Sequence, residues 1–107
     1  MTGIVTVYAT FADADEAARI ARTLVEERLA ACANILGPIR SIYRWEGRIE
    51  DASEVAALFK TRADRADALI ARLAELHSYE VAAAAVFPIA NIHPPFGAWI
   101  EAETAER

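Results

Sequence analysis

The sequence has little that would cross-link the chain or direct it to a membrane. Cys32 is the only cysteine, which excludes an intrachain disulfide and favours a reducing compartment, so a cytoplasmic location is expected. The two longest uncharged stretches, residues 81–100 and 29–39, both contain proline and are not typical of membrane-spanning helices. No positively charged segment precedes an apolar one at the N-terminus, so a signal peptide is not expected.

Basic residues are also few and scattered. The chain has 11 Lys and Arg against 16 Asp and Glu, with a net charge of −5, and Lys60 is the only lysine. A nucleic-acid-binding protein normally carries a basic stripe, so neither a nucleic-acid nor a membrane partner is expected. The four glycines lie far apart, which excludes a glycine-rich phosphate loop.

Large apolar side chains are scarcer than the composition first suggests. Hydrophobic residues make up 55% of the 107 positions, but 25 of those residues are alanine. Alanine contributes little apolar area, and burial is worth only ~25 cal/mol per Å². The length predicts one domain, residues 1–107, with a thin core, and small side chains leave close packing in an oligomer as an open alternative.

Hydrophobic periodicity predicts alternating strands and helices. The expected elements are a strand at 4–9, a helix from Asp13 or Asp15 to about Glu27, a strand at 29–45 interrupted at Gly37-Pro38, a turn at Glu46-Gly47, a strand at 53–61, a helix at about 62–77, a strand at 81–89, and a short helix at 96–103 with Trp99 and Ile100 inward.

This βαββαβ order indicates an α+β, ferredoxin-like sandwich with a long hairpin, both crossover helices on one sheet face and a short C-terminal helix. In the segment 81–89 the odd-numbered and the even-numbered residues are both largely apolar, so both faces of the strand must be buried. We expect a partner chain to cover the second face.

A few polar and aromatic residues are candidates for function. Lys60 is either a lysine whose charged end reaches solvent or the lining of an anion pocket. His77, at a helix end, either hydrogen-bonds the last carbonyls or forms a polar cluster with Tyr79 and Glu80. Cys32, among small residues, is interpreted as a packing residue.

The aromatic residues near the hairpin tip have two interpretations. Tyr43 and Trp45 lie on one parity of the strand, close to the turn at Glu46-Gly47. Aromatic side chains near a strand edge often anchor an interface, so a subunit contact is favoured over plain core packing.

Five blocks occur in a characteristic order along the chain. They are Leu29-Ala30-Ala31-Cys32-Ala33-Asn34, Tyr43-Arg44-Trp45-Glu46-Gly47, Lys60-Thr61-Arg62, His77-Ser78-Tyr79-Glu80-Val81 and Ala98-Trp99-Ile100. Together these blocks resemble the CutA-type divalent-cation-tolerance family over nearly the whole chain. The resemblance implies a tight, P-II-like homotrimer, a role in tolerance of divalent metals, chiefly copper, and no enzymatic reaction.

The resemblance also implies where the chain departs from its relatives. Some members carry Cys and His where this sequence has Ala9 and Leu76, which leaves His77 as a weak metal ligand. Ser78 and Ala82 replace prolines of the family pattern, and Phe96 replaces a tyrosine. A copper site built from the family ligands is therefore incomplete.

The resulting hypothesis is a non-enzymatic homotrimer with ligand or metal sites in the clefts between subunits. We expect Lys60, Tyr79, Glu80 and Trp99 to line each cleft, with His77 as a weak metal ligand, and Tyr43 and Trp45 to lie at the trimer interface. The alternative is a stable trimeric scaffold or signalling protein that anchors a partner protein.

Overall fold

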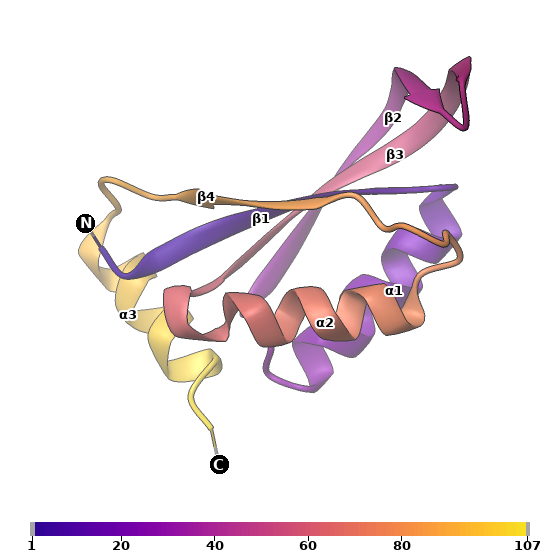
Figure 1. Ribbon diagram of the computed structural model, residues 1–107. Coiled ribbons are helices and arrows are strands. Elements are labelled where there is room, and N and C mark those ends of the chain that lie inside the picture. Colours follow the sequence, from indigo (N-terminus) through magenta and orange to yellow (C-terminus); the bar gives the residue numbers. More distant parts are fainter. Residues whose placement is uncertain (1, 107) are drawn as a thin grey trace.

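The computed structural model describes residues 2–106 and shows a four-stranded antiparallel sheet with three helices (Figure 1). The strand order is β2-β3-β1-β4, which confirms the α+β class. The elements are β1 (Ile4–Phe11), α1 (Ala14–Glu26), β2 (Cys32–Trp45), β3 (Arg48–Arg62), the 3₁₀ turn η1 (Ala63–Arg65), α2 (Ala66–Leu76), β4 (Ala84–Pro88) and α3 (Pro94–Glu103).

The helices α1 and α2 cover one face of the sheet. Alternate residues of a strand point to opposite faces, and Val7 and Phe59 point toward the helices. There they pack with Ile20 and Leu24 of α1 and Leu69 of α2, all of them fully buried. The buried apolar residues of the two helices recur at helical spacing, so each helix buries one side of its surface against the sheet.

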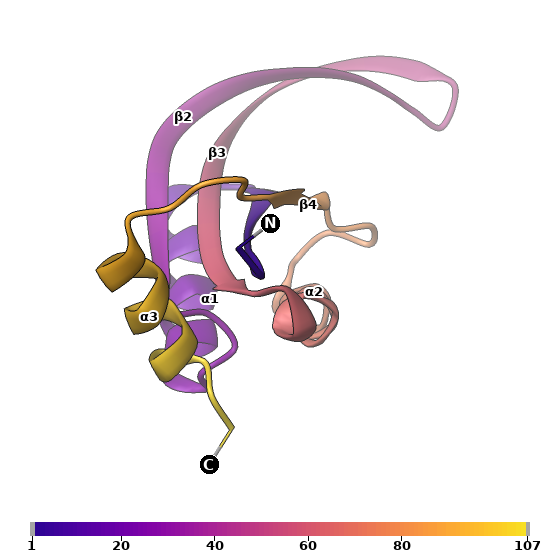
Figure 2. The same cartoon turned by 90° about the vertical axis from the view of Figure 1, so that its left-hand side faces the viewer.

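The third helix packs separately. In α3, Ile100 is fully buried and forms a second, smaller cluster with Ile4 and Ala31. Figure 2 shows α2 and α3 on opposite sides of β3. The prediction that Trp99 also faces inward is wrong, because its side chain is 44% exposed. Consecutive helix residues point about 100° apart, so burying Ile100 turns Trp99 toward the surface.

The last strand is shorter than predicted. The sequence pattern indicated a strand at 81–89, whereas β4 spans Ala84–Pro88 and pairs only with Val5–Ala9 of β1. Val81 lies before the strand and is exposed. Pro88 has no N–H to donate and stands at the end of the ladder, which limits the strand there.

The hairpin of β2 and β3 extends well beyond the sheet. β1 pairs with β3 only from Val55 to Arg62, so the pairing of residues 39–45 with 48–54 forms a free two-stranded ribbon. The register shifts between Ile35 and Gly37, as the Gly37-Pro38 pair predicted, and Gly37 has a φ of 95° that favours glycine. Both figures show the ribbon projecting from the body of the molecule, and Figure 2 shows that it is curved.

Within residues 2–106, no helix has the length and apolar character needed to cross a membrane.

Candidate functional site

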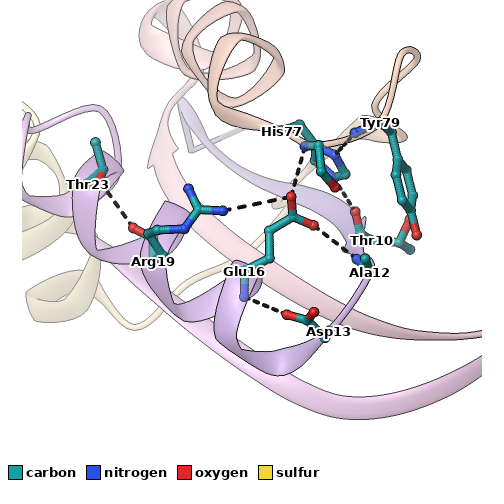
Figure 3. Close-up of polar contacts among 9 residues, drawn as sticks. Thr10, Ala12, Asp13, Glu16, Arg19, Thr23, His77 and Tyr79 are labelled. Atoms are coloured by element: carbon teal, nitrogen blue, oxygen red, sulfur yellow. Dashed lines mark hydrogen bonds and ion pairs between the residues drawn. The ribbon is translucent and has the colours of Figure 1, made fainter.

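His77 lies directly after α2 and connects three elements (Figure 3). Its side chain is only 8% exposed and its ring stacks on Phe11, with centroids 5.1 Å apart. The Nε2 atom lies 2.8 Å from the Thr10 carbonyl oxygen, and the Tyr79 N–H donates to Nδ1 at 3.0 Å. His77 thus joins the end of β1 to the loop that follows α2.

These two hydrogen bonds define the tautomer of the ring. A backbone N–H can only donate, so Nδ1 is the acceptor, and a carbonyl can only accept, so Nε2 carries the proton. Both ring nitrogens are occupied within the chain. A metal ion would have to displace one of these hydrogen bonds to reach a lone pair of His77, so the role of His77 as a weak metal ligand stays a prediction.

Glu16, near the start of α1, also holds the loop after α2. Its carboxylate accepts a hydrogen bond from the N–H group of Ala12 at 3.1 Å (Figure 3) and another from the N–H group of Ser78 at 2.8 Å. Asp13 caps α1 by accepting from the Glu16 N–H at 2.8 Å. Burial raises the pKa of the Glu16 carboxyl, but the hydrogen bonds from Ser78 and Ala12 outweigh it, so the net pKa is lowered. The carboxylate is therefore the form that holds the loop.

Tyr79 is held at both ends. Its N–H donates to His77, and its hydroxyl donates to Oε2 of Glu54 at 2.7 Å. Glu54 belongs to β3 and is only 6% exposed. Burial, together with the neighbouring Glu54 carboxylate, raises the pKa of Tyr79, so its hydroxyl remains a protonated donor. The ring is thereby fixed above the end of the sheet.

A pocket of about 250 Å³ opens beside this fixed ring. Its lining comes from the ribbon and from the loop after α2, and consists of Tyr43, Trp45, Tyr79, Glu80 and Val81. The structure thus brings two of the predicted cleft residues together with the two predicted interface residues.

A family model described as the CutA1 divalent ion tolerance protein matches residues 5–103. The chain belongs to this family. The match confirms the resemblance seen in the sequence.

Members of the CutA family resemble this chain in sequence and in structure. The divalent-cation tolerance protein CutA of Pyrococcus horikoshii is 41% identical over 101 residues, which is 94% of this chain and 98% of that protein. Protein CutA of Mus musculus is 42% identical over 82% of this chain, which spans 50% of the mouse protein. The crystal structure of CutA from Xylella fastidiosa has a TM-score of 0.93 at 37% identity, covering 96% of this chain and 99% of that one.

The other predicted cleft residues do not join this site within one chain. Lys60 of β3 pairs with Cys32 of β2 and donates to the Asn34 side-chain oxygen at 3.0 Å. Lys60 pairs with Thr6 of β1, whereas His77 contacts Thr10, and four strand residues span about 13 Å. Trp99 lies on α3 and stacks on Phe96, with ring centroids 6.0 Å apart.

Among residues 2–106, no group of three or more His, Cys, Asp or Glu side chains could hold a metal ion. The two positions at which the family resemblance implied metal ligands are packing positions here. Ala9 is fully buried in the main core, and Leu76 packs against that core.

Glu16 and Glu54, which lie at the centre of this site, were not identified from the sequence. Glu16 follows Asp13 by three residues at the start of a helix, which is the spacing of a capping box, so this signal could have identified Glu16. Glu54 carries no comparable signal, because its partner Tyr79 is 25 residues away.

Replacing Glu16 by glutamine tests the loop network. The amide keeps one acceptor but turns an NH2 group toward a backbone N–H, so we expect the free energy of unfolding to fall by about 1–3 kcal/mol at neutral pH. Because the folded-state pKa of Glu16 is lowered, its contribution is present above the unfolded pKa, near 4.5, and is lost as the pH falls through the folded value. The difference between the two proteins in urea unfolding should therefore shrink in acid.

The matched control is Glu26→Gln, which removes the same charge from an exposed position on α1. It should leave the free energy of unfolding nearly unchanged. Equal effects of the two substitutions at neutral pH would show that net charge, rather than the network, explains the loss.

Proposed function

We propose that this CutA-family protein is a ferredoxin-like, P-II-like homotrimer that acts in divalent-cation tolerance without catalysing a reaction. The observation that carries the proposal is the apolar surface that one chain leaves uncovered. Phe87 on β4 is 54% exposed, and Ile42 on the ribbon is 66% exposed. Large uncovered apolar surfaces of this kind mark protein interaction sites.

Strand pairing supports the same conclusion. The strands β4 and β2 are the two edges of the sheet, and an open edge is a template for pairing with another chain. A two-stranded ribbon is at best marginally stable when solvated on both faces. In the proposed trimer, Tyr43 and Trp45 contact a neighbouring subunit through the part of each aromatic ring that does not line the pocket.

A second copy would also complete the predicted cleft. Lys60 and Trp99 lie apart from Tyr79 and Glu80 within one chain. We propose that Lys60 and Trp99 of one subunit face Tyr79 and Glu80 of the next, in a cleft that receives a small ligand or a divalent metal such as copper. The cleft offers one positive and one negative charge between aromatic walls.

The absence of catalysis is part of the proposal and has a physical basis. Both nitrogens of His77 are engaged, and the Tyr79 hydroxyl is committed to Glu54. Burial raises the pKa of the Cys32 thiol, although the charge of Lys60 opposes this, so the thiol stays protonated and is a weak nucleophile. A thiol in this state suits the reducing cytoplasm, which is the proposed location.

The projecting ribbon supports a second candidate function, a trimeric scaffold that anchors a partner protein. Its exposed residues Ile42 and Ile49 lie outside the main sheet, where a partner could reach them. The two candidates differ in what the cleft does, since only the first requires Lys60 and Glu80.

The interface is tested by Phe87→Asp. A carboxylate at this apolar position cannot be buried between subunits without a large desolvation cost, so we expect the variant to be monomeric where the natural protein is trimeric. Light scattering gives the subunit count, and circular dichroism reports whether the fold survives the loss of the contact with Tyr8.

Ala71→Asp is the matched control, because Ala71 lies on the exposed side of α2, away from the proposed interface. This variant should remain trimeric. A folded Phe87→Asp variant that stays trimeric would overturn the placement of the interface at β4.

Copper binding is tested with His77→Ala. Because a metal ion would have to displace a hydrogen bond of His77, we expect copper uptake per subunit to stay unchanged while the free energy of unfolding falls by about 1–3 kcal/mol. Native mass spectrometry with and without added copper measures the uptake. His93→Ala, which removes the exposed imidazole, is the control, and loss of stoichiometric copper in His77→Ala alone would contradict the geometry.

A further inference from the structure

The pocket between the ribbon and the loop after α2 has the composition of an organic-cation site. Three of its five lining residues are aromatic, one is acidic, and none is basic. We propose that this pocket binds a small quaternary ammonium compound. Its volume of about 250 Å³ is suited to a ligand of this size. Sites for drug-sized molecules are usually larger, at roughly 300–1,000 Å³.

The aromatic walls come from both sides of the pocket. Tyr43 and Trp45 are two residues apart on β2 and therefore share a face of the ribbon. Tyr79 stands across from them, held by its hydrogen bonds to His77 and Glu54. A cation within about 6 Å of an aromatic centroid is attracted by the negative face of the ring, and tryptophan is the strongest partner. A wall fixed in advance loses little freedom when the ligand binds.

The charges near the pocket favour a cation. Glu80 lines the pocket, and the buried carboxylate of Glu54 lies behind Tyr79, joined to its hydroxyl. Across the ribbon, the half-buried Glu50 pairs with Tyr43 and the exposed Arg48 with Trp45, so these two charges offset each other. Within one chain the remaining charge beside the pocket is negative, and in the proposed trimer a neighbouring Lys60 would reduce it.

The chemistry of the lining distinguishes an organic cation from a metal ion or a primary amine. A divalent metal requires several oxygen, nitrogen or sulfur ligands, and the pocket offers one carboxylate beside two phenol rings. A primary ammonium group has three N–H donors that need acceptors, whereas a fully methylated, quaternary ammonium group has none. Recognition by aromatic rings with one nearby acid therefore fits the methylated form best.

This inference goes beyond the proposed function, but it uses residues that the proposed trimer also uses, because Tyr79 and Glu80 line the cleft and Tyr43 and Trp45 contact a neighbour. All five lining residues belong to one chain, so the pocket forms before a neighbour adds to it. A monomer that binds choline would therefore support the pocket alone, and a trimer that does not bind choline would support the subunit arrangement alone.

The test is calorimetric titration of the natural protein with choline, its neutral isostere 3,3-dimethyl-1-butanol, and ethanolamine. The three compounds share a two-carbon alcohol and differ in the charge and methylation of the head group. We expect choline to bind one site per chain, and each of the other two to bind at least about fivefold more weakly. Equal binding of choline and the neutral isostere would overturn the proposal, as would absence of choline binding.

Two substitutions locate the site. Trp45→Leu removes the strongest aromatic wall and Glu80→Gln removes the charge, and each should weaken choline binding by about three- to thirtyfold. Glu26→Gln removes the same charge far from the pocket and should leave the affinity unchanged. Choline binding that survives Trp45→Leu and Glu80→Gln intact would place the ligand elsewhere and contradict the proposal.

The subunit count of each variant is measured in the same samples by sedimentation. If Trp45→Leu weakens choline binding while the trimer persists, the effect belongs to the pocket. Glu80→Gln, at an exposed position, supplies a second variant whose folding does not depend on an aromatic contact.

Discussion

The central constraint of this structure is that helices cover only one face of the sheet along most of its length. α1 and α2 bury Val7 and Phe59, whereas α3 protects the opposite face only around Ile4. A chain of 107 residues with 25 alanines has too few large apolar side chains to cover the remainder. The exposed Phe87 and the free ribbon follow from this shortage, and in the proposed trimer further copies of the chain would cover them.

The polar network around His77 fixes the position of the loop after α2. Glu16 holds this loop through Ser78, His77 holds it through Thr10, and Glu54 holds the Tyr79 ring. Each bond connects segments far apart in sequence, so the loop is fixed by the fold rather than by its own residues. This rigidity gives the pocket a defined wall, and both ring nitrogens of His77 are engaged in hydrogen bonds within the chain.

Much of the fold could be predicted from the sequence because its signals are local. Helical spacing located α1 and α2, and Gly37-Pro38 located the bulge in β2. The errors concern features that are set by tertiary packing. Trp99 points outward because Ile100 is the α3 residue that is buried, and Val81 lies outside the strand because β4 begins only at Ala84. The site was harder to predict, because the contact of Glu54 with Tyr79 depends on how β3 meets the loop.

The central claim is that one chain is an incomplete unit and that copies of it cover the exposed face. Sedimentation equilibrium of the natural protein at micromolar concentration tests this claim most directly. We expect a single species of three times the 11.7 kDa chain mass. A folded species that sediments at 11.7 kDa, with Phe87 and the ribbon exposed to solvent, would contradict this claim.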